Sequence, residues 1–169
     1  MMVLSTLFGG GMSSRLFQEV REKRGLCYSI FSFASMYSDS GHFGVYAGTS
    51  AEQADEMLTV TAQQLAEVAM NVGEDEVSRA KAQLRASLVM ARESVSGCGD
   101  ALARQIMLFG APVDDAELLD QIAAVDAASV RGVAGDLIGG GQPAIAAIGP
   151  QSSIMENDRL AALLAGGSA

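Results

Sequence analysis

The 169-residue sequence contains few of the residues that bind metal ions or form disulfides: two cysteines and one histidine. Cys27 and Cys98 are too few and too far apart for a disulfide framework or a zinc ribbon, and we expect both to be small thiols of the core. A His-x-x-Glu-His zinc helix needs two histidines, whereas His42 stands alone and is expected to face solvent near a turn. The chain by itself therefore cannot form that zinc site.

Two further absences limit the function classes. The sequence has no Gly-x-Ser-x-Gly motif, and one histidine distant from any marked serine argues against a Ser-His-Asp triad. No segment approaches the roughly 18 uncharged apolar residues of a membrane span, and nothing at the start resembles a signal peptide. We therefore expect a soluble globular domain with no membrane span, and the cytoplasm is the favoured compartment.

Basic residues are scarce as well. Eleven Lys and Arg stand against 20 Asp and Glu, which gives a net charge of −9 and a pI near 4.4. With a net negative charge, the surface as a whole is not expected to bind nucleic acid or an acidic membrane. Four of the 11 basic residues nevertheless fall within residues 15–24, so this segment differs from the rest of the chain.

The first 50 residues predict helices followed by a hairpin. Apolar residues at helical spacing open the chain, the glycines at 9–11 interrupt it, and Ser13 or Ser14 can cap a short helix that Gly25 ends. A phosphate-binding loop at 9–14 is disfavoured, because no strand precedes it and no Gly-Lys-Ser/Thr follows. Residues 26–36 and 42–49 are expected to be antiparallel strands joined by a turn at 38–41.

The rest of the chain predicts mainly helices. Their expected positions are 50–68 with Ser50 as cap, 74–95, 102–109 after a break at Gly97 and Gly99, 114–122 capped by Asp114, and 126–137 capped by Asp126. A short strand is expected at 144–148, and the tail 151–169 is expected to be a loosely held amphipathic turn or disordered.

This order predicts an α+β fold in which helices cover one face of an antiparallel-rich sheet. Two hairpin strands and one distant strand are too few for such an apolar helical layer. The helical turn at the start also has no capping residue before it. We therefore expect that the first strands are missing at the N-terminus or are supplied by another subunit. The fragment should then self-associate or be held by a partner, through the unpaired, uncharged edge at 26–35 and an uncovered apolar face.

Residues 7–29, LFGGGMSSRLFQEVREKRGLCYS, resemble the signature of the C-terminal, non-zinc half of the pitrilysin and mitochondrial processing peptidase family of zinc proteases. A weaker resemblance extends over 76–93, 103–125 and 144–150. It implies two homologous halves that enclose a chamber, with zinc bound by a His-x-x-Glu-His helix of the other half. Residues 1–150 would then be the non-zinc, peptidase-like domain without its first strands, and 151–169 a tail.

In that family an Arg and a Tyr seven residues later reach from this half towards the peptide at the zinc. Arg21 and Tyr28 match the spacing, with Cys27 where many members have a small residue. Because Arg21 ends a helix, Gly25 reverses the chain and Tyr28 opens a strand, the two donors can converge on one carbonyl. A guanidinium and a phenol are suitable donors to a substrate oxygen. The neighbouring Arg15, Lys23 and Arg24 are expected to lie on a solvated face.

Two functional classes follow from the resemblance. The first is the substrate-binding half of a zinc metalloendopeptidase, inactive alone, whose partners are a zinc-bearing half and a peptide. The second is a non-proteolytic scaffold, similar to the core subunits of respiratory complexes. The presence of both Arg21 and Tyr28 favours the peptidase.

Overall fold

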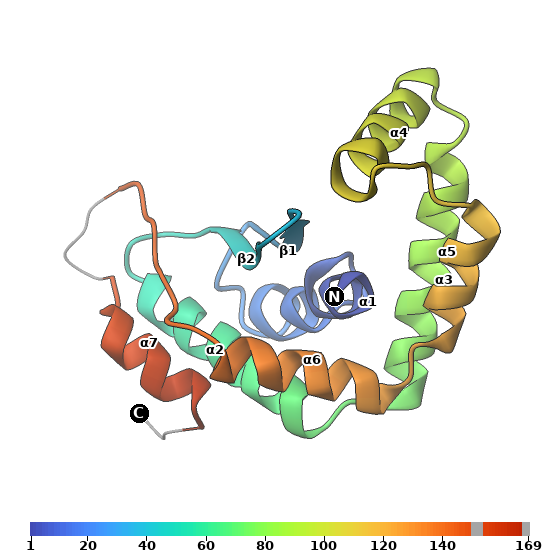
Figure 1. Ribbon diagram of the computed structural model, residues 1–169. Coiled ribbons are helices and arrows are strands. Elements are labelled where there is room, and N and C mark those ends of the chain that lie inside the picture. Colours follow the sequence, from blue (N-terminus) through green and yellow to red (C-terminus); the bar gives the residue numbers. More distant parts are fainter. Residues whose placement is uncertain (150–153, 167–169) are drawn as a thin grey trace.

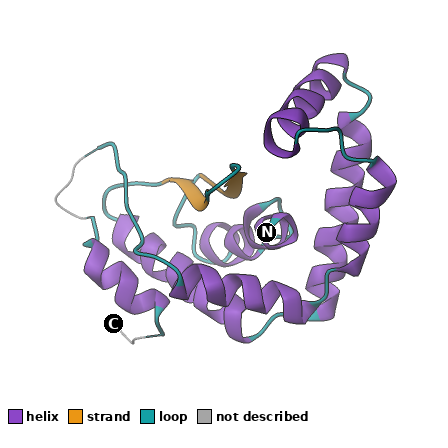
Figure 2. Cartoon of the chain, in the orientation of Figure 1, coloured by secondary structure: helices purple, strands orange, loops and turns teal. Residues whose placement is uncertain are grey.

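A computed structural model describes residues 1–149 and 154–166 of the chain. Its elements are α1 (Met2–Gly9), the π-helix η1 (Phe17–Glu22), β1 (Ser29–Met36), β2 (Gly41–Gly48), α2 (Ala54–Met70), α3 (Glu74–Ala91), α4 (Val95–Phe109), α5 (Asp115–Ala124), α6 (Ala127–Gly139) and α7 (Asn157–Leu164). Figures 1 and 2 show one antiparallel hairpin with helices packed beneath it. The α+β class, with helices over one face of an antiparallel sheet, is confirmed.

The expected hairpin is present. β1 and β2 pair antiparallel, with Ser29 opposite Gly48 and Met36 opposite Gly41. β1 begins three residues later than predicted. The N–H of Leu26 donates to the Val20 carbonyl and its carbonyl accepts from Thr49 Oγ1 at 2.6 Å, so its backbone groups bond outside the ladder. Within the described residues the sheet has these two strands, so the expectation of further strands stays a prediction.

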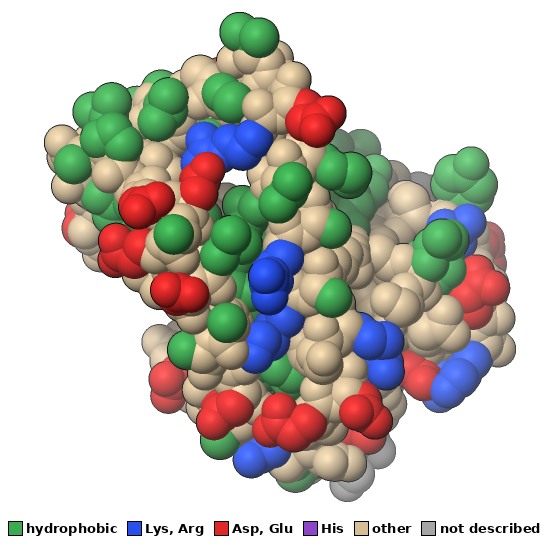
Figure 3. All heavy atoms as spheres, turned by 90° about the vertical axis from the view of Figure 1, so that its right-hand side faces the viewer, with side chains coloured by type: hydrophobic (Ala, Val, Ile, Leu, Met, Phe, Trp, Pro, Cys, Tyr) green, Lys and Arg blue, Asp and Glu red, His purple; other side chains and the backbone are tan. Residues whose placement is uncertain are grey.

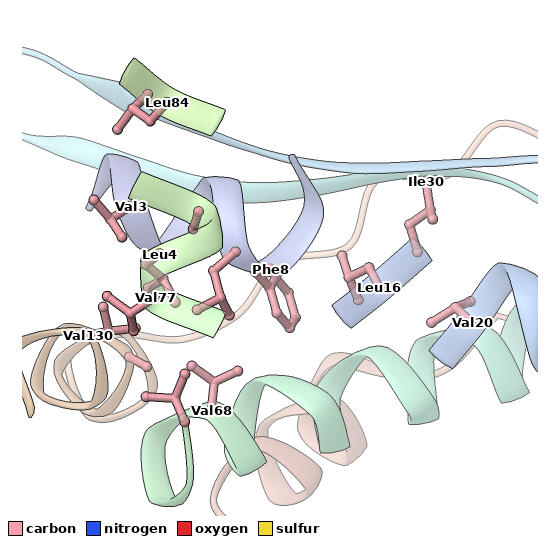
Figure 4. Close-up of a cluster of buried hydrophobic side chains, with 14 of the residues drawn as sticks. Val3, Leu4, Phe8, Leu16, Val20, Ile30, Val68, Val77, Leu84 and Val130 are labelled. Atoms are coloured by element: carbon pink, nitrogen blue, oxygen red, sulfur yellow. The ribbon is translucent and has the colours of Figure 1, made fainter. Parts of the chain in front are cut away.

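α1 lies against the inner face of the hairpin and forms the centre of the core. The rings of Phe8 and Phe43 are 6.0 Å apart between centroids, and a Cβ on Gly9 would stand 2.3 Å from the backbone nitrogen of Ser32. Gly9 therefore allows the helix to approach the strand, which accounts for this glycine without a phosphate ligand. The largest fully buried side chains, all labelled in Figure 4, are Leu4, Phe8, Leu16, Val20, Val68 and Val77.

Local capping signals set two of the later helix starts. Asp114 accepts a hydrogen bond from the backbone of Ala116, and Asp126 accepts one from Ser129, which confirms both predicted caps. Ser50 does not cap α2. Residues 51–53 form a turn first, so α2 begins four residues later than expected.

α4 starts where the sequence predicted a break. Ser94 caps this helix by accepting from the backbone of Gly97 at 3.2 Å, so Gly97 and Gly99 lie inside its first turns. The expected break at these glycines is wrong because the serine cap decides the boundary. α4 projects from the end of α3 (Figure 1), and none of its residues is buried.

Residues 144–148 do not form the predicted strand. Ile145 packs instead against a small cluster of Ala62, Met155 and Leu163, while Ile148 is fully exposed. An apolar run becomes a strand only when it meets an unpaired strand, and this segment passes α7 rather than the hairpin. Pro150, which follows this segment in the sequence, lies outside the described residues.

The tail is not loosely held where the structure describes it. Residues 157–164 form α7, which packs on α2 through Leu163, and Arg159 forms an ion pair with Asp55 at 3.0 Å. The prediction of a loose turn or disorder is therefore wrong for 154–166. The division of the chain at residue 150 stays a prediction. In the described part, no helix combines the length and apolarity needed to cross a membrane.

Candidate functional site

Arg21 lies in the last turn of η1, so the short helix that the sequence predicted here is a π-helix. The backbone N–H of Lys23 donates to the carbonyl of Gln18, five residues back, which is the wide hydrogen bonding of a π-helix. Gly25 follows with a φ of 64°, a left-handed conformation that favours glycine. The N–H of Leu26 then donates to the Val20 carbonyl, so the chain turns back immediately after Arg21.

Tyr28 lies one residue before β1. Its N–H donates to the Gly48 carbonyl at 2.8 Å, which fixes its backbone at the end of the hairpin. Its side chain is 85% exposed and therefore free to contact another molecule. Gln53 supports the preceding turn by donating to the Gly25 carbonyl at 3.3 Å.

The turn brings the two predicted site residues together. Cζ of Arg21 is 5.8 Å from the ring centroid of Tyr28, and 4.6 Å from that of Phe17. The guanidinium thus lies beside two aromatic rings, one from η1 and one from the residue that precedes β1. A guanidinium and a phenol at this separation can donate to one acceptor oxygen or to two neighbouring oxygens of a peptide.

The other basic residues of the segment have acidic partners. Lys23 and Arg24 both pair with Glu19, and these two hydrogen bonds hold the pKa of that carboxyl below its usual value. Arg15 does not lie on the solvated face, as the sequence suggested, but reaches Glu76 in α3. Within the described chain the guanidinium of Arg21 has no carboxylate partner, so it is available to an incoming acceptor.

Cys27 and His42 were the sequence's other chemically distinctive residues near the hairpin. Cys27 is buried, which raises the pKa of its thiol, while the positive charge of Arg21 opposes this rise. Its expected place in the core is confirmed. His42 is exposed near the hairpin turn, as expected, with its ring edge-on to Phe33. Cys98 is only half-buried, so it is not the core thiol that we expected.

The residues present do not fit a zinc ion. Across 1–149 and 154–166, no three His, Cys, Asp or Glu side chains come close enough together to hold a metal. The single histidine lies among aromatic rings, edge-on to Phe33 and stacked with Tyr37.

The sequence did not identify Phe17 as part of the site. The spacing of four residues between Phe17 and Arg21, which places both on one helical face, is the signal that could have identified it. The sequence also did not identify the row of exposed rings on the outer face of the hairpin, where Phe31 stacks on Tyr46 with 5.1 Å between centroids. Strand alternation could have shown this row, because Phe31 and Phe33 are two residues apart.

Residues 1–84 match the family described as the peptidase M16 inactive domain. An uncharacterized zinc protease of Streptomyces coelicolor is 42% identical over 88% of this chain and 32% of its own length. A probable mitochondrial-processing peptidase subunit beta of Arabidopsis thaliana is 34% identical over 89% of this chain and 30% of its own. The chain thus spans about a third of the length of the curated relatives it matches.

Solved structures share the fold. A chain from complex III2 of Candida albicans with Inz-5 bound matches with a TM-score of 0.72, 21% identity, and coverage of 80% of this chain and 34% of that one. A conserved protein from Enterococcus faecalis V583 matches with a TM-score of 0.67, 23% identity, and coverage of 79% and 31%. At these identities the likeness concerns the fold.

Proposed function

Because the chain belongs to the peptidase M16 inactive domain family, we propose that it is the substrate-binding, non-zinc half of a zinc metalloendopeptidase. It is inactive alone. Its partner is a homologous half that carries the His-x-x-Glu-His helix, and its substrate is a peptide. We assign the zinc site to that partner half; the described residues of this chain contain no group of three metal-ligating side chains.

The observation that carries this proposal is the position of Arg21 beside Tyr28. The guanidinium has no carboxylate partner in the described chain, and the phenol is exposed. Two unpaired donors side by side in a chain of net charge −9 are suited to an acceptor from another molecule. We assign that acceptor to the scissile peptide.

The chemistry follows from how the charge on the peptide oxygen changes. During hydrolysis the carbonyl oxygen becomes an oxyanion, and donors already in place stabilise it more than they stabilise the starting peptide. The phenol of Tyr28 donates one hydrogen bond and Arg21 supplies a positive charge with further N–H donors. Both side chains therefore bind the peptide and polarise its carbonyl.

Mixing the two halves tests whether both are needed for peptide cleavage. Peptide cleavage is measured for this chain, for the zinc-bearing half, and for both together at matched zinc content. We expect cleavage only when both are present. Cleavage by this chain alone, or an unchanged rate when the zinc-bearing half acts without it, would contradict the proposal.

A non-proteolytic scaffold is the alternative. The fold that this chain shares with a chain of complex III2 supports it, whereas the presence of both Arg21 and Tyr28 favours the peptidase. The identity of the natural partner half decides between them. A partner that forms a stable complex with this chain, contains no His-x-x-Glu-His motif and cleaves no peptide with it would favour the scaffold.

A further inference from the structure

Phe17 contacts the guanidinium of Arg21 more closely than any other aromatic ring does. The separation is 4.6 Å from Cζ to the ring centroid, against 5.8 Å for Tyr28. An arginine over the face of a ring within about 6 Å is attracted by the negative charge of that face. The two rings therefore hold the guanidinium from two elements of the fold.

No packing role in the hydrophobic core accounts for Phe17. It is half-buried and is not part of the hydrophobic core cluster, in contrast to Leu16 and Val20 on either side of it, which are fully buried. Its ring covers a side chain that has no ion pair within the described residues. Arginine is long and flexible, so without such a contact it would have to be ordered by the substrate at an entropic cost.

We propose that Phe17 is a positioning residue: its ring holds Arg21 beside Tyr28 before the peptide binds. This inference rests on the proposed function, because it explains how the donor pair is preorganised. Phe17 itself touches no substrate. Its effect on the reaction passes entirely through Arg21.

The first test measures the contact itself and needs no activity. Proton NMR of the chain is compared for the wild type, Phe17→Leu and the matched control Phe17→Tyr, which keeps the ring. The ring current of Phe17 should displace the side-chain resonances of Arg21 upfield, and Phe17→Leu should remove this displacement while Phe17→Tyr keeps it. Resonances that are the same in all three proteins would overturn the inference.

The second test is a double-mutant cycle on the complete enzyme, with Phe17→Leu, Arg21→Gln and the double variant. Phe17→Leu should lower kcat/KM by about 2- to 10-fold, the range expected for losing one cation–π contact. It should have no further effect when Arg21 is already Gln, because a residue that acts through Arg21 cannot act in its absence. Equal effects in both backgrounds would show a general structural role and overturn the inference.

The cycle also separates the two proposals. If Arg21→Gln leaves kcat/KM unchanged, the proposed function of Arg21 fails, and the NMR comparison still decides whether Phe17 holds the guanidinium. If Arg21→Gln lowers kcat/KM and Phe17→Leu does not, the positioning role alone fails. Phe17→Tyr serves as the control in the cycle, because it keeps a ring beside the guanidinium of Arg21.

Discussion

Arg15 and Glu76 form a two-pronged ion pair that joins segments 61 residues apart. Nε and Nη2 of Arg15 donate to the two carboxylate oxygens of Glu76 at 2.9 and 2.8 Å, and Nη2 also donates to the Asn71 carbonyl at 2.7 Å. The side chain of Arg15 is 13% exposed, so the pair is largely shielded from solvent. It fixes the start of the segment that carries Arg21 against α3.

Glu76→Gln should destabilise the chain. The substitution removes the charge that both Arg15 donors contact, and hydrogen bonds to charged groups contribute about 1.5–3 kcal/mol each when shielded. We expect the free energy of unfolding to fall by about 1–3 kcal/mol. Each kcal/mol should lower Tm by about 2–4 °C. Thermal unfolding followed by circular dichroism at low protein concentration measures it. Glu93→Gln is the control, because Glu93 is exposed and its side chain has no described partner. Equal Tm values for the wild type and Glu76→Gln would contradict the prediction.

The stability contributed by Glu76 should depend on pH. The hydrogen bond from Arg15 holds the pKa of the Glu76 carboxyl below its ordinary value near 4.5. A carboxyl whose pKa is lower in the folded state stabilises the fold fully above the unfolded pKa and ceases to do so as the pH falls through the folded pKa. The Tm difference between the wild type and Glu76→Gln should therefore be constant near neutral pH and shrink below about pH 4.5. A difference that stays constant down to pH 3 would exclude this ion pair as its origin.

Tyr28→Phe should impair the complete enzyme without unfolding the domain, because the phenol is exposed. If its hydroxyl stabilises the oxyanion, kcat and kcat/KM should fall together by roughly 10²–10³. Tyr37→Phe is the matched control, since Tyr37 is also an exposed tyrosine but lies at the other end of β1. Steady-state kinetics of the two variants decide the point. Wild-type kinetics for Tyr28→Phe would exclude the role.

The purified chain should bind no zinc. Its only histidine lies among aromatic rings, and the described residues contain no group of three metal-ligating side chains. We expect elemental analysis of the chain after dialysis against zinc to show far less than one equivalent. Stoichiometric, tightly held zinc would show that this half carries a metal site of its own.

Local sequence signals predicted the elements that depend on neighbouring residues. The hairpin, its turn and the caps at Asp114 and Asp126 follow from turn and capping chemistry within a few residues. The family resemblance singled out Arg21 and Tyr28, and the turn at Gly25 allowed them to converge; the structure places Cζ of Arg21 5.8 Å from the ring centroid of Tyr28.

The features that the sequence did not predict depend on distant partners. The sequence places Arg15 on a solvated face, whereas in the fold α3 packs nearby and its Glu76 forms an ion pair with Arg15. The run at 144–148 has strand composition, but α7 occupies its neighbourhood and the sheet does not reach it. Near Gly97 the sequence has two opposing local signals, a glycine that disfavours a helix and a serine that can cap one. The helix starts at the Ser94 cap and includes the glycine. Residue type alone does not reveal which partner a side chain will have.

The isolated chain should self-associate. Much of its apolar surface is uncovered, on the outer face of the hairpin and on α4, whose side chains form part of the apolar upper region in Figure 3. The exposed residues on α4 are Val95, Leu102, Ile106, Met107 and Phe109. Soluble monomers rarely leave contiguous apolar patches of more than a few hundred Å² open to water. We expect the particle mass at micromolar concentration to exceed 17.5 kDa by light scattering.

Two variants identify the surface responsible for this association. Met107→Lys places a charge on α4, and Phe31→Lys places one on the outer face of the hairpin, both at exposed positions that the core does not use. The variant that restores a monomer marks the contact, because burying an unpaired charge is costly. If the same surface binds the zinc-bearing half, adding that half should reduce self-association. A wild-type chain that is a clean monomer and unfolds cooperatively would show that these faces need no cover, and that the expectation of missing strands is wrong.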